Sequence, residues 1–268
     1  MSLGIIFVSA VPAFAGMVGS PRQLPAGSLK IFAYYEGVQG QDLDFALSSE
    51  GQCTTNNGTS PNAGFACGST GHVSAEGSGG SGKVRVLYQP YESVQYRLGA
   101  GVGDYSLKVA SITQANTLNG GSPGTSLDAG LKFVLWPDTL VGPGLAADLG
   151  MEWDSYRFTS FPQARTAAEG AIDQRLDLLR TQVSLQTGHV FKPESWRVGV
   201  EPYGGVQWIR TQAWLKDYKG GGCVGGIQDT VAPFLGVHLA VYENEGLFVE
   251  ASVVNGWRYA AGLNVRFK

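Results

Sequence analysis

The chain ends on Trp257–Lys268, WRYAAGLNVRFK, a stretch in which the side-chain character changes at almost every residue. The odd positions carry apolar or aromatic side chains: Trp257, Tyr259, Ala261, Leu263, Val265 and Phe267. The even positions include Arg258, Asn264 and Arg266. Because successive side chains of a β-strand point to opposite faces, this stretch predicts a strand with one apolar face and one charged face. An antiparallel sheet with one wet face and the wall of a membrane barrel both contain such strands.

The same two-residue alternation recurs along the chain from residue 28 onward. It is clear in residues 29–36, 83–88, 94–102, 126–136, 145–153, 198–208, 231–241 and 247–253. One region is ambiguous, because residues 164–180 (ARTAAEGAIDQRLDLLR) are compatible with a short helix before a strand over residues 178–190. With the C-terminal stretch, the pattern predicts about ten strands.

The connections between these segments alternate between long and short. The expected short connections are residues 89–92, 137–143, 192–195 and 243–246, followed by a tight turn at Asn255-Gly256. The expected long connections are residues 38–82, 110–125, 159–174 and 212–228. A soluble β-sandwich has no reason to sort its loops by length onto opposite ends, whereas a membrane barrel has short periplasmic turns and long outer loops. The sequence therefore favours an all-β, closed, antiparallel up-and-down transmembrane β-barrel.

Charged side chains fall almost entirely on one face of the predicted strands. We expect this face to line the lumen with Lys30, Glu36, Arg85, Arg97, Lys132, Asp148, Glu152, Asp154, Arg180, Arg197, Glu201, Glu250, Arg258 and Arg266. The opposite face of the same segments carries essentially no charge, as expected where an arginine or lysine at the lipid midplane costs about 2–4 kcal/mol. Because acids and bases nearly balance, we expect ion pairs to fill the lumen. Glycines on the same face leave space for the long side chains.

Aromatic side chains on the apolar face fall near the predicted strand ends. Lipid–water interfaces favour such girdles of tyrosine and tryptophan. The expected girdle is Tyr35, Tyr88, Trp153, Trp208, Trp257 and Phe267.

The first residues resemble a secretory signal. The apolar run LGIIFVSAVPAFAG ends in Ala13-Phe14-Ala15, an A-x-A cleavage pattern, although no lysine or arginine precedes it. Residues 1–15 are therefore either a signal peptide or a buried element of the mature chain. We expect residues 16–27 to form a periplasmic segment and residues 28–268 a single barrel domain with a long first loop, residues 38–82.

Composition excludes several other classes of function. The net charge of −3 and the absence of a basic tract argue against nucleic-acid binding. In an oxidising compartment Cys53 and Cys67 would form a disulfide, which leaves Cys223 free or paired between chains. No histidine or second cysteine stands at metal-ligand spacing, so we expect neither a metal nor a cofactor.

The chain resembles the small outer-membrane β-barrel families of Gram-negative bacteria, over roughly residue 28 to the end. The resemblance rests on the alternating terminal strand with Phe267 near its end; here Lys268 follows that phenylalanine. It implies a location in the outer membrane, with both termini in the periplasm and with membrane lipid and lipopolysaccharide as partners.

Three functions are compatible with such a barrel. We expect a non-enzymatic protein with a charged, largely filled lumen, acting in surface contact, envelope structure or assembly through its extracellular loops. Trp214 and Tyr218 are the expected loop contacts, and a protein partner would bind at the loops or through Cys223. A narrow passive channel for small solutes is the first alternative. An outer-membrane protease or lipid-modifying enzyme is the second, although its chemistry would need one of three histidines, of which His72 falls in the expected first loop.

Overall fold

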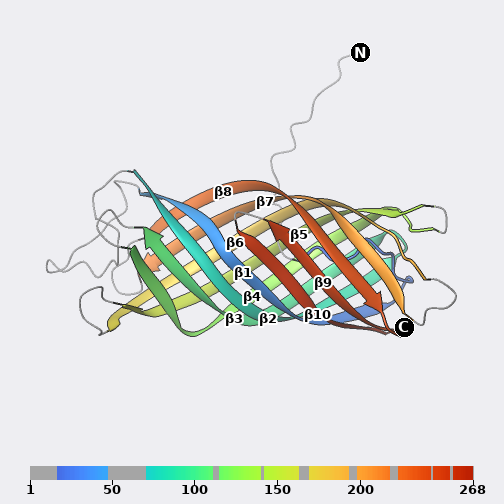
Figure 1. Cartoon of the computed structure of the whole chain (residues 1–268), viewed down its shortest axis with the longest axis horizontal. Coiled ribbons are helices and arrows are strands. Elements are labelled where there is room, and N and C mark those ends of the chain that lie inside the picture. The colour runs from blue at the N-terminus through green and yellow to red at the C-terminus, as the bar shows by residue number, and fades with distance from the viewer. Residues whose placement is uncertain are drawn as a thin grey trace, which may run out of the picture.

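Ten strands make up the regular structure of the described part of the chain (Figure 1). The computed structural model describes residues 17–47, 71–110, 115–139, 142–162, 169–192, 198–217, 223–242, 244–253 and 256–267. The strands are β1 (Leu29–Leu47), β2 (Gly71–Tyr91), β3 (Val94–Ala110), β4 (Ala115–Trp136), β5 (Gly144–Pro162), β6 (Glu169–Gly188), β7 (Gly199–Asp217), β8 (Cys223–Ala240), β9 (Glu245–Val253) and β10 (Trp257–Phe267). Within these residues, no helix is long and apolar enough to cross a membrane.

The C-terminal stretch closes the barrel. β10 pairs with β1 in continuous antiparallel register, from Leu29↔Phe267 to Gln39↔Trp257. Every other strand pairs with its neighbour in sequence, so the sheet is a closed up-and-down cylinder of ten strands. The predicted fold class and strand number are confirmed. Below, the end at Leu29 and Phe267 is called the terminal end, and the opposite end is called the loop end.

Eight of the strands are longer than the sequence predicts. β1 to β8 contain 17 to 22 residues each, whereas β9 and β10 contain 9 and 11. The expected first loop, residues 38–82, is shortened from both sides, because β1 continues to Leu47 and β2 begins at Gly71. The other long connections, expected at residues 110–125, 159–174 and 212–228, are shortened in the same way. His72, expected in the first loop, lies in β2.

The first part of β2 was not predicted because it is rich in glycine. The segment GHVSAEGSGGSG resembles a flexible linker, yet it forms a regular ladder with β1 and β3. A Cβ atom on Gly77 would lie 1.7 Å from the hydroxyl oxygen of Tyr105, and one on Gly80 would lie 1.8 Å from that of Tyr35. These glycines therefore leave room for tyrosine rings of the adjacent strands.

The short helix that residues 164–180 were compatible with does not form in the part that the structure describes. Residues from Glu169 onward belong to β6, and residues 163–168 lie outside the described residues. Leu176, Leu178 and Arg180 all point into the barrel. The leucines follow one another because the apolar side chains of β6 face inward up to Leu178. From Leu179 onward, toward the terminal end, they face outward.

Both faces of the wall change character part-way along the strands. On β7, the outward side chains Val206 and Trp208 are followed toward the loop end by Arg210. Over the same distance, the inward side chains change from the carboxylate of Glu201 to the apolar side chain of Leu215. The terminal part of the barrel is thus apolar outside and charged inside, and the loop part is the reverse.

The number of strands also changes along the barrel. β9 and β10 are short, and beyond their turn β1 reaches β8 directly through the pair Ala46↔Gly225. A register shift between Val38 and Gln41, with Gly40 at φ +66°, redirects β1 toward β8. The loop part is therefore an eight-stranded cylinder. Cylinders of that size are filled by side chains, whereas the ten-stranded terminal part is wider.

Candidate functional site

The outer surface of the terminal part is a continuous apolar belt. Its most exposed side chains include Leu98, Val102, Leu127, Val206, Val231, Leu235, Val249 and Leu263. On β5 and β7 the belt runs from Leu145 to Trp153 and from Val200 to Trp208. Each run matches the roughly 9–11 residues that a tilted strand needs to cross a bilayer. An apolar exterior of this height around a charged interior fits lipid and not water. The chain is a transmembrane β-barrel.

The predicted aromatic girdle points outward. Tyr35, Tyr88, Trp257 and Phe267 are all exposed, and Trp153 and Trp208 are partly covered. An arginine lies over each of these two tryptophans: Arg175 is 5.8 Å from the ring centroid of Trp153, and Arg210 is 5.5 Å from that of Trp208. These two tryptophans mark the loop-side border of the apolar belt.

Outward-facing charges begin beyond that border. The sequence pattern missed them because they lie on the strand extensions that it did not predict. Most are paired: Arg157 with Asp173, Arg175 and Lys216 with Asp177, Arg210 with Asp229, and Lys108 with Glu76. The pKa of Asp229 lies below its ordinary value because Arg210 donates hydrogen bonds to it.

A compact ion cluster crosses the lumen at the level of the belt. It joins three carboxylates and three cations: Glu36, Glu152, Asp154, Lys83, Arg180 and Arg258. Glu152 is its centre, because Lys83 donates to it at 2.9 Å and Arg258 at 3.0 Å, and Arg180 also donates to it. Lys83 is not among the predicted lumen charges, although it lies two residues before Arg85 and therefore on the same face of the strand.

Two further ion pairs lie closer to the terminal end. Arg85 donates to Asp128 at 2.9 Å, and Arg97 donates to both oxygens of Asp148 at 2.7 and 2.8 Å. Asp128 was also missed, although it lies on the inner face of β4, four residues before Lys132. A Cβ atom at Gly150 would lie 1.3 Å from Nη2 of Arg97, so this inner glycine makes room for the guanidinium, as expected.

The chain's own N-terminal segment occupies the terminal end of the lumen. The backbone N–H groups of Val18 and Gly19 each donate to Glu250 at 2.9 Å. Lys132 donates to the carbonyl oxygens of Val18 and Ser20 at 3.0 and 2.7 Å. Gly19 has φ +73°, and this turn presents neighbouring N–H and C=O groups to opposite walls. The segment was expected in the periplasm, and nothing in the alternation pattern indicated its contacts with the lumen.

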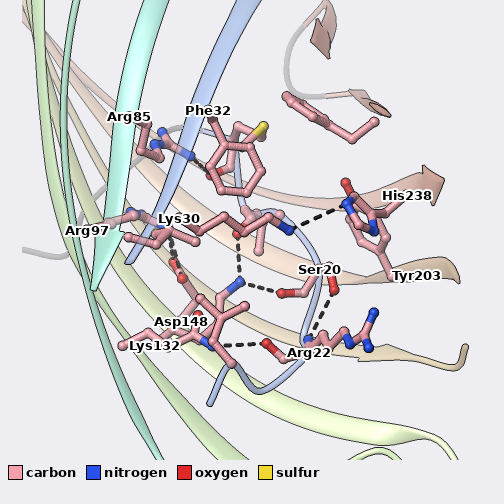
Figure 2. Close-up of a pocket in the computed structure, with 17 residues that line it drawn as sticks. Ser20, Arg22, Lys30, Phe32, Arg85, Arg97, Lys132, Asp148, Tyr203 and His238 are labelled. Atoms are coloured by element: carbon pink, nitrogen blue, oxygen red, sulfur yellow. Dashed lines mark hydrogen bonds and ion pairs between the residues drawn. The ribbon is translucent and has the colours of Figure 1, made fainter. Parts of the chain in front are cut away.

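More contacts fix the same segment. Arg85 donates to the carbonyl oxygen of Met17 at 2.5 Å, the hydroxyl of Ser20 donates to Glu201, and the N–H of Leu24 donates to Gln89 at 2.7 Å. Figure 2 shows Ser20 and Arg22 on an irregular segment that passes between Lys132 and His238. The segment therefore plugs this end of the barrel.

An apolar core fills the lumen of the eight-stranded part. It consists of Leu43, Ala75, Tyr105, Leu107, Leu118, Tyr156, Phe158, Leu176, Leu178, Ala213 and Leu215. The rings of Tyr105 and Tyr156 stack at a centroid distance of 4.8 Å and separate this core from the ion cluster. The expectation of a lumen filled by charges is thus wrong for the loop end, because side chains that lie outside the membrane there follow the pattern of a water-soluble barrel.

The remaining predicted site residues are scattered. Arg266 lies near the terminal end and donates to Asn244 at 3.1 Å. Trp214 belongs to β7 and not to a loop, where it pairs with Gly225. Cys223 is the first residue of β8. Four residues lie outside the described residues: Arg197, Tyr218, Cys53 and Cys67.

The histidines with described side chains both lie toward the terminal end. His189 Nδ1 is 2.7 Å from Asp138 Oδ1, at the ends of β6 and β4. His238 lies between Lys30, at 3.4 Å, and Asn264, at 3.0 Å. Among the described residues, no group of three or more His, Cys, Asp or Glu side chains is placed to hold a metal ion.

Comparisons with known proteins found similar chains among solved structures. No protein-family profile and no curated protein sequence matches the chain. Among solved structures, the outer membrane protease OmpT of Escherichia coli is similar over 92% of this chain and 100% of its own, with 11% identity and a TM-score of 0.48. The outer membrane protein OprG of Pseudomonas aeruginosa covers 93% of this chain and 99% of its own, with 12% identity and a TM-score of 0.45. The translocator domain of the autotransporter NalP from Neisseria meningitidis covers 91% and 89%, with 11% identity and a TM-score of 0.45.

Proposed function

We propose that this chain is a non-conducting barrel of the bacterial outer membrane, with both termini in the periplasm, that serves surface contact or envelope structure through its loop end. The filled lumen is the observation that carries this proposal. The N-terminal segment, the ion cluster centred on Glu152 and the apolar core around Leu176 follow one another along the axis. A solute would have to displace all three layers.

Conductance tests the closed lumen directly. The full-length protein, folded in detergent, is inserted into planar bilayers, and a general porin in the same bilayers serves as the insertion control. We expect no stable open steps from this chain. Regular open steps would contradict the proposal and favour the narrow channel. Such a channel would open only if the segment around Val18, the ion cluster and the apolar core all moved.

The projecting loop part supplies the surface for contact. Beyond the belt, Arg157, Arg175 and Lys216 stand opposite one another on adjacent strands β5, β6 and β7. With Arg210 and the two tryptophans beneath, they form what is here called the Arg–Trp patch (Arg157, Arg175, Arg210, Lys216, Trp153, Trp208). Guanidinium and ammonium groups above an aromatic girdle suit the phosphates and acyl chains of lipopolysaccharide.

A titration with lipopolysaccharide tests this contact. The double variant R175Q/R210Q removes two cations of the Arg–Trp patch, whereas K108Q removes an outward cation on β3, outside the patch. We expect lipopolysaccharide to raise the thermal unfolding midpoint of the wild type and of K108Q, and to raise that of the double variant much less. Equal shifts in all three proteins would contradict a role for the patch.

A protein partner through Cys223 is a separate part of the proposal. Cys223 is at the loop end of β8, paired in register with Lys216. We expect a thiol-sensitive, higher-mass species of the wild type on a non-reducing gel of cell envelopes and its loss in C223S. An unchanged pattern in C223S would exclude this cysteine as the point of attachment.

A further inference from the structure

A chamber remains between the N-terminal segment and the barrel wall (Figure 2). Together with the open solvent at its mouth, the space that atoms do not fill is about 590 Å³. Met17, Val18 and Gly19 form one side, and the rings of Phe32 and Phe248 form part of another. The chamber is thus a product of the wide ten-stranded end, which the plug does not completely fill.

The polar lining of this chamber is strongly biased toward cations. Five cationic side chains line it: Arg22, Lys30, Arg85, Arg97 and Lys132. Asp148 is the one carboxylate among its described lining residues, and both of its oxygens already accept from Arg97. The chamber therefore presents positive charge that its own lining does not neutralise.

Among the buried cations of this lining, Lys30 has the fewest polar partners. Its amino group is 3.4 Å from His238 Nε2 and 4.9 Å from the centroid of Phe32. Within the described part of the chain, no carboxylate oxygen lies within 4.0 Å of the Lys30 amino group, and none lies that close to Lys132. Glu201 is the carboxylate with the largest electrostatic effect on Lys30, but it does not contact the amino group. Burial of an ammonium group without a contacting counter-ion is costly, so an anion next to Lys30 would be bound favourably.

Unpartnered donors on the same wall are an independent observation. Nη2 of Arg85 and Nε of Arg97 are buried and have no hydrogen-bond partner in the described structure. Buried polar groups in native proteins nearly always find a partner, whether protein, water or ligand. Both side chains line the chamber, but Nε of Arg97 lies over Gly130 of the wall, so Nη2 of Arg85 is the unpartnered donor that supports the same conclusion as Lys30.

We propose that the chamber binds a small oxyanion, a phosphate or a carboxylate, with Lys30 as its main ligand and Arg22 and Lys132 as further donors. Arg22 is exposed and also lines the chamber, so an anion enters from the terminal end. Because the chamber lies inside the barrel, the ligand is a free anion from solution and not a lipid headgroup. This inference goes beyond the proposed surface function and does not depend on it.

Titration with inorganic phosphate tests the site. The full chain, folded in a detergent that carries no phosphate group, is titrated calorimetrically at constant ionic strength with chloride as the replaced anion. We expect saturable binding to the wild type, at least tenfold weaker binding to K30M, and several-fold weaker binding to R22Q. K108M, which replaces a paired lysine on the outer surface of β3, is the matched control and should bind as the wild type does.

Two outcomes would overturn the proposal. One is a weak, unsaturable response that is equal in the wild type, K30M and K108M, which is the behaviour of general ionic screening. The other is saturable binding that K30M and R22Q leave unchanged. Heat-modifiable migration on a gel verifies that each variant folds, and R22Q keeps the test valid if K30M does not fold, because Arg22 is exposed. Phosphate binding by a barrel that nevertheless conducts would refute the proposed function alone.

Discussion

The backbone N–H of Val18 donates to Oε1 of Glu250 at 2.9 Å, although the two residues are 232 positions apart in sequence. Glu250 also accepts from the N–H of Gly19 and from the hydroxyl of Tyr203 at 3.0 Å. This inward carboxylate therefore connects the N-terminal segment with β9, which carries Glu250, and with β7, which carries Tyr203. Hydrogen bonds to charged groups contribute about 1.5–3 kcal/mol each, so this contact is a principal anchor of the segment.

Glu250→Ala removes the acceptor of all three hydrogen bonds. We expect the barrel to keep its heat-modifiable migration but to lose about 2–5 kcal/mol of unfolding free energy, because buried N–H groups are left unpaired. Limited proteolysis should cleave the N-terminal segment faster than in the wild type. Glu245→Gln, on an exposed position of the same strand, is the control and should change neither property. Unchanged proteolysis of E250A would show that other contacts hold the plug.

Gly150→Ala tests whether the inner glycines make room for the lumen ion pairs. The new Cβ would lie 1.3 Å from Nη2 of Arg97, so the guanidinium must move and its pair with Asp148 must break. We expect a loss of about 1–3 kcal/mol or more, as for other overpacked interiors. Gly82→Ala adds the same methyl group on the outer face of β2, where nothing lies within 4 Å, and should be neutral. Urea unfolding in detergent measures both, and equal stabilities would contradict the packing argument.

The sequence predicted the membrane-crossing part of the barrel and missed the rest for one physical reason. The segments read from the alternation, such as residues 145–153 and 198–208, coincide with the outer apolar belt. Beyond Trp208, toward the loop end, the apolar side chains occupy inward positions instead of outward ones. The alternation of apolar and polar residues is therefore shifted by one position there. On β6 this phase change places Leu176 on the inner face and Leu179 on the outer face, and their spacing of three residues resembles one face of a helix.

Only those residues of the candidate site that lie on the strands of the barrel could be predicted from the sequence. Arg97 and Glu152 could be placed in the lumen because strand parity decides the face. The contacts of Val18 and Gly19 could not be predicted, because they are made by backbone groups of an irregular segment. The alternation pattern could not indicate a partner for Lys132, because the acceptors of its hydrogen bonds are main-chain oxygens of the N-terminal segment.

The outward pairs beyond the belt make stability depend on pH. Burial alone would raise the pKa of Asp177, but hydrogen bonds from Lys216, Ser155 and Arg175 outweigh burial and hold the pKa below its ordinary value. A carboxylate with a depressed folded pKa contributes stability above its unfolded pKa and loses it as the pH falls through the folded pKa. We therefore expect Asp177→Asn to be less stable than the wild type at pH 7, with a difference that shrinks below about pH 4.

Unfolding midpoints of the wild type and D177N between pH 7 and pH 3 measure this convergence. Because its partners Arg175 and Lys216 are largely open to solvent, the difference at pH 7 should be small, within the range of about 1 kcal/mol found for surface ion pairs. Asp104→Asn removes an exposed carboxylate for which we find no ion pair among the described residues. It should not change the pH dependence. Parallel curves for the wild type and D177N would contradict the assignment.

Phe158→Ala tests whether the apolar core holds the projecting part of the barrel together. Phe158 is fully buried among Leu118, Leu176 and Leu178, so its truncation should cost about 3–5 kcal/mol through lost burial and the cavity that remains. Leu235→Ala removes a similar apolar side chain from the lipid-facing surface, where 72% of it is exposed, and should cost much less in detergent. Because the core lies beyond the belt, hydrogen exchange of F158A should rise in the loop-end halves of β5 and β6 while the belt stays protected. Uniform exchange over whole strands would instead mean that the two parts of the barrel unfold as one unit.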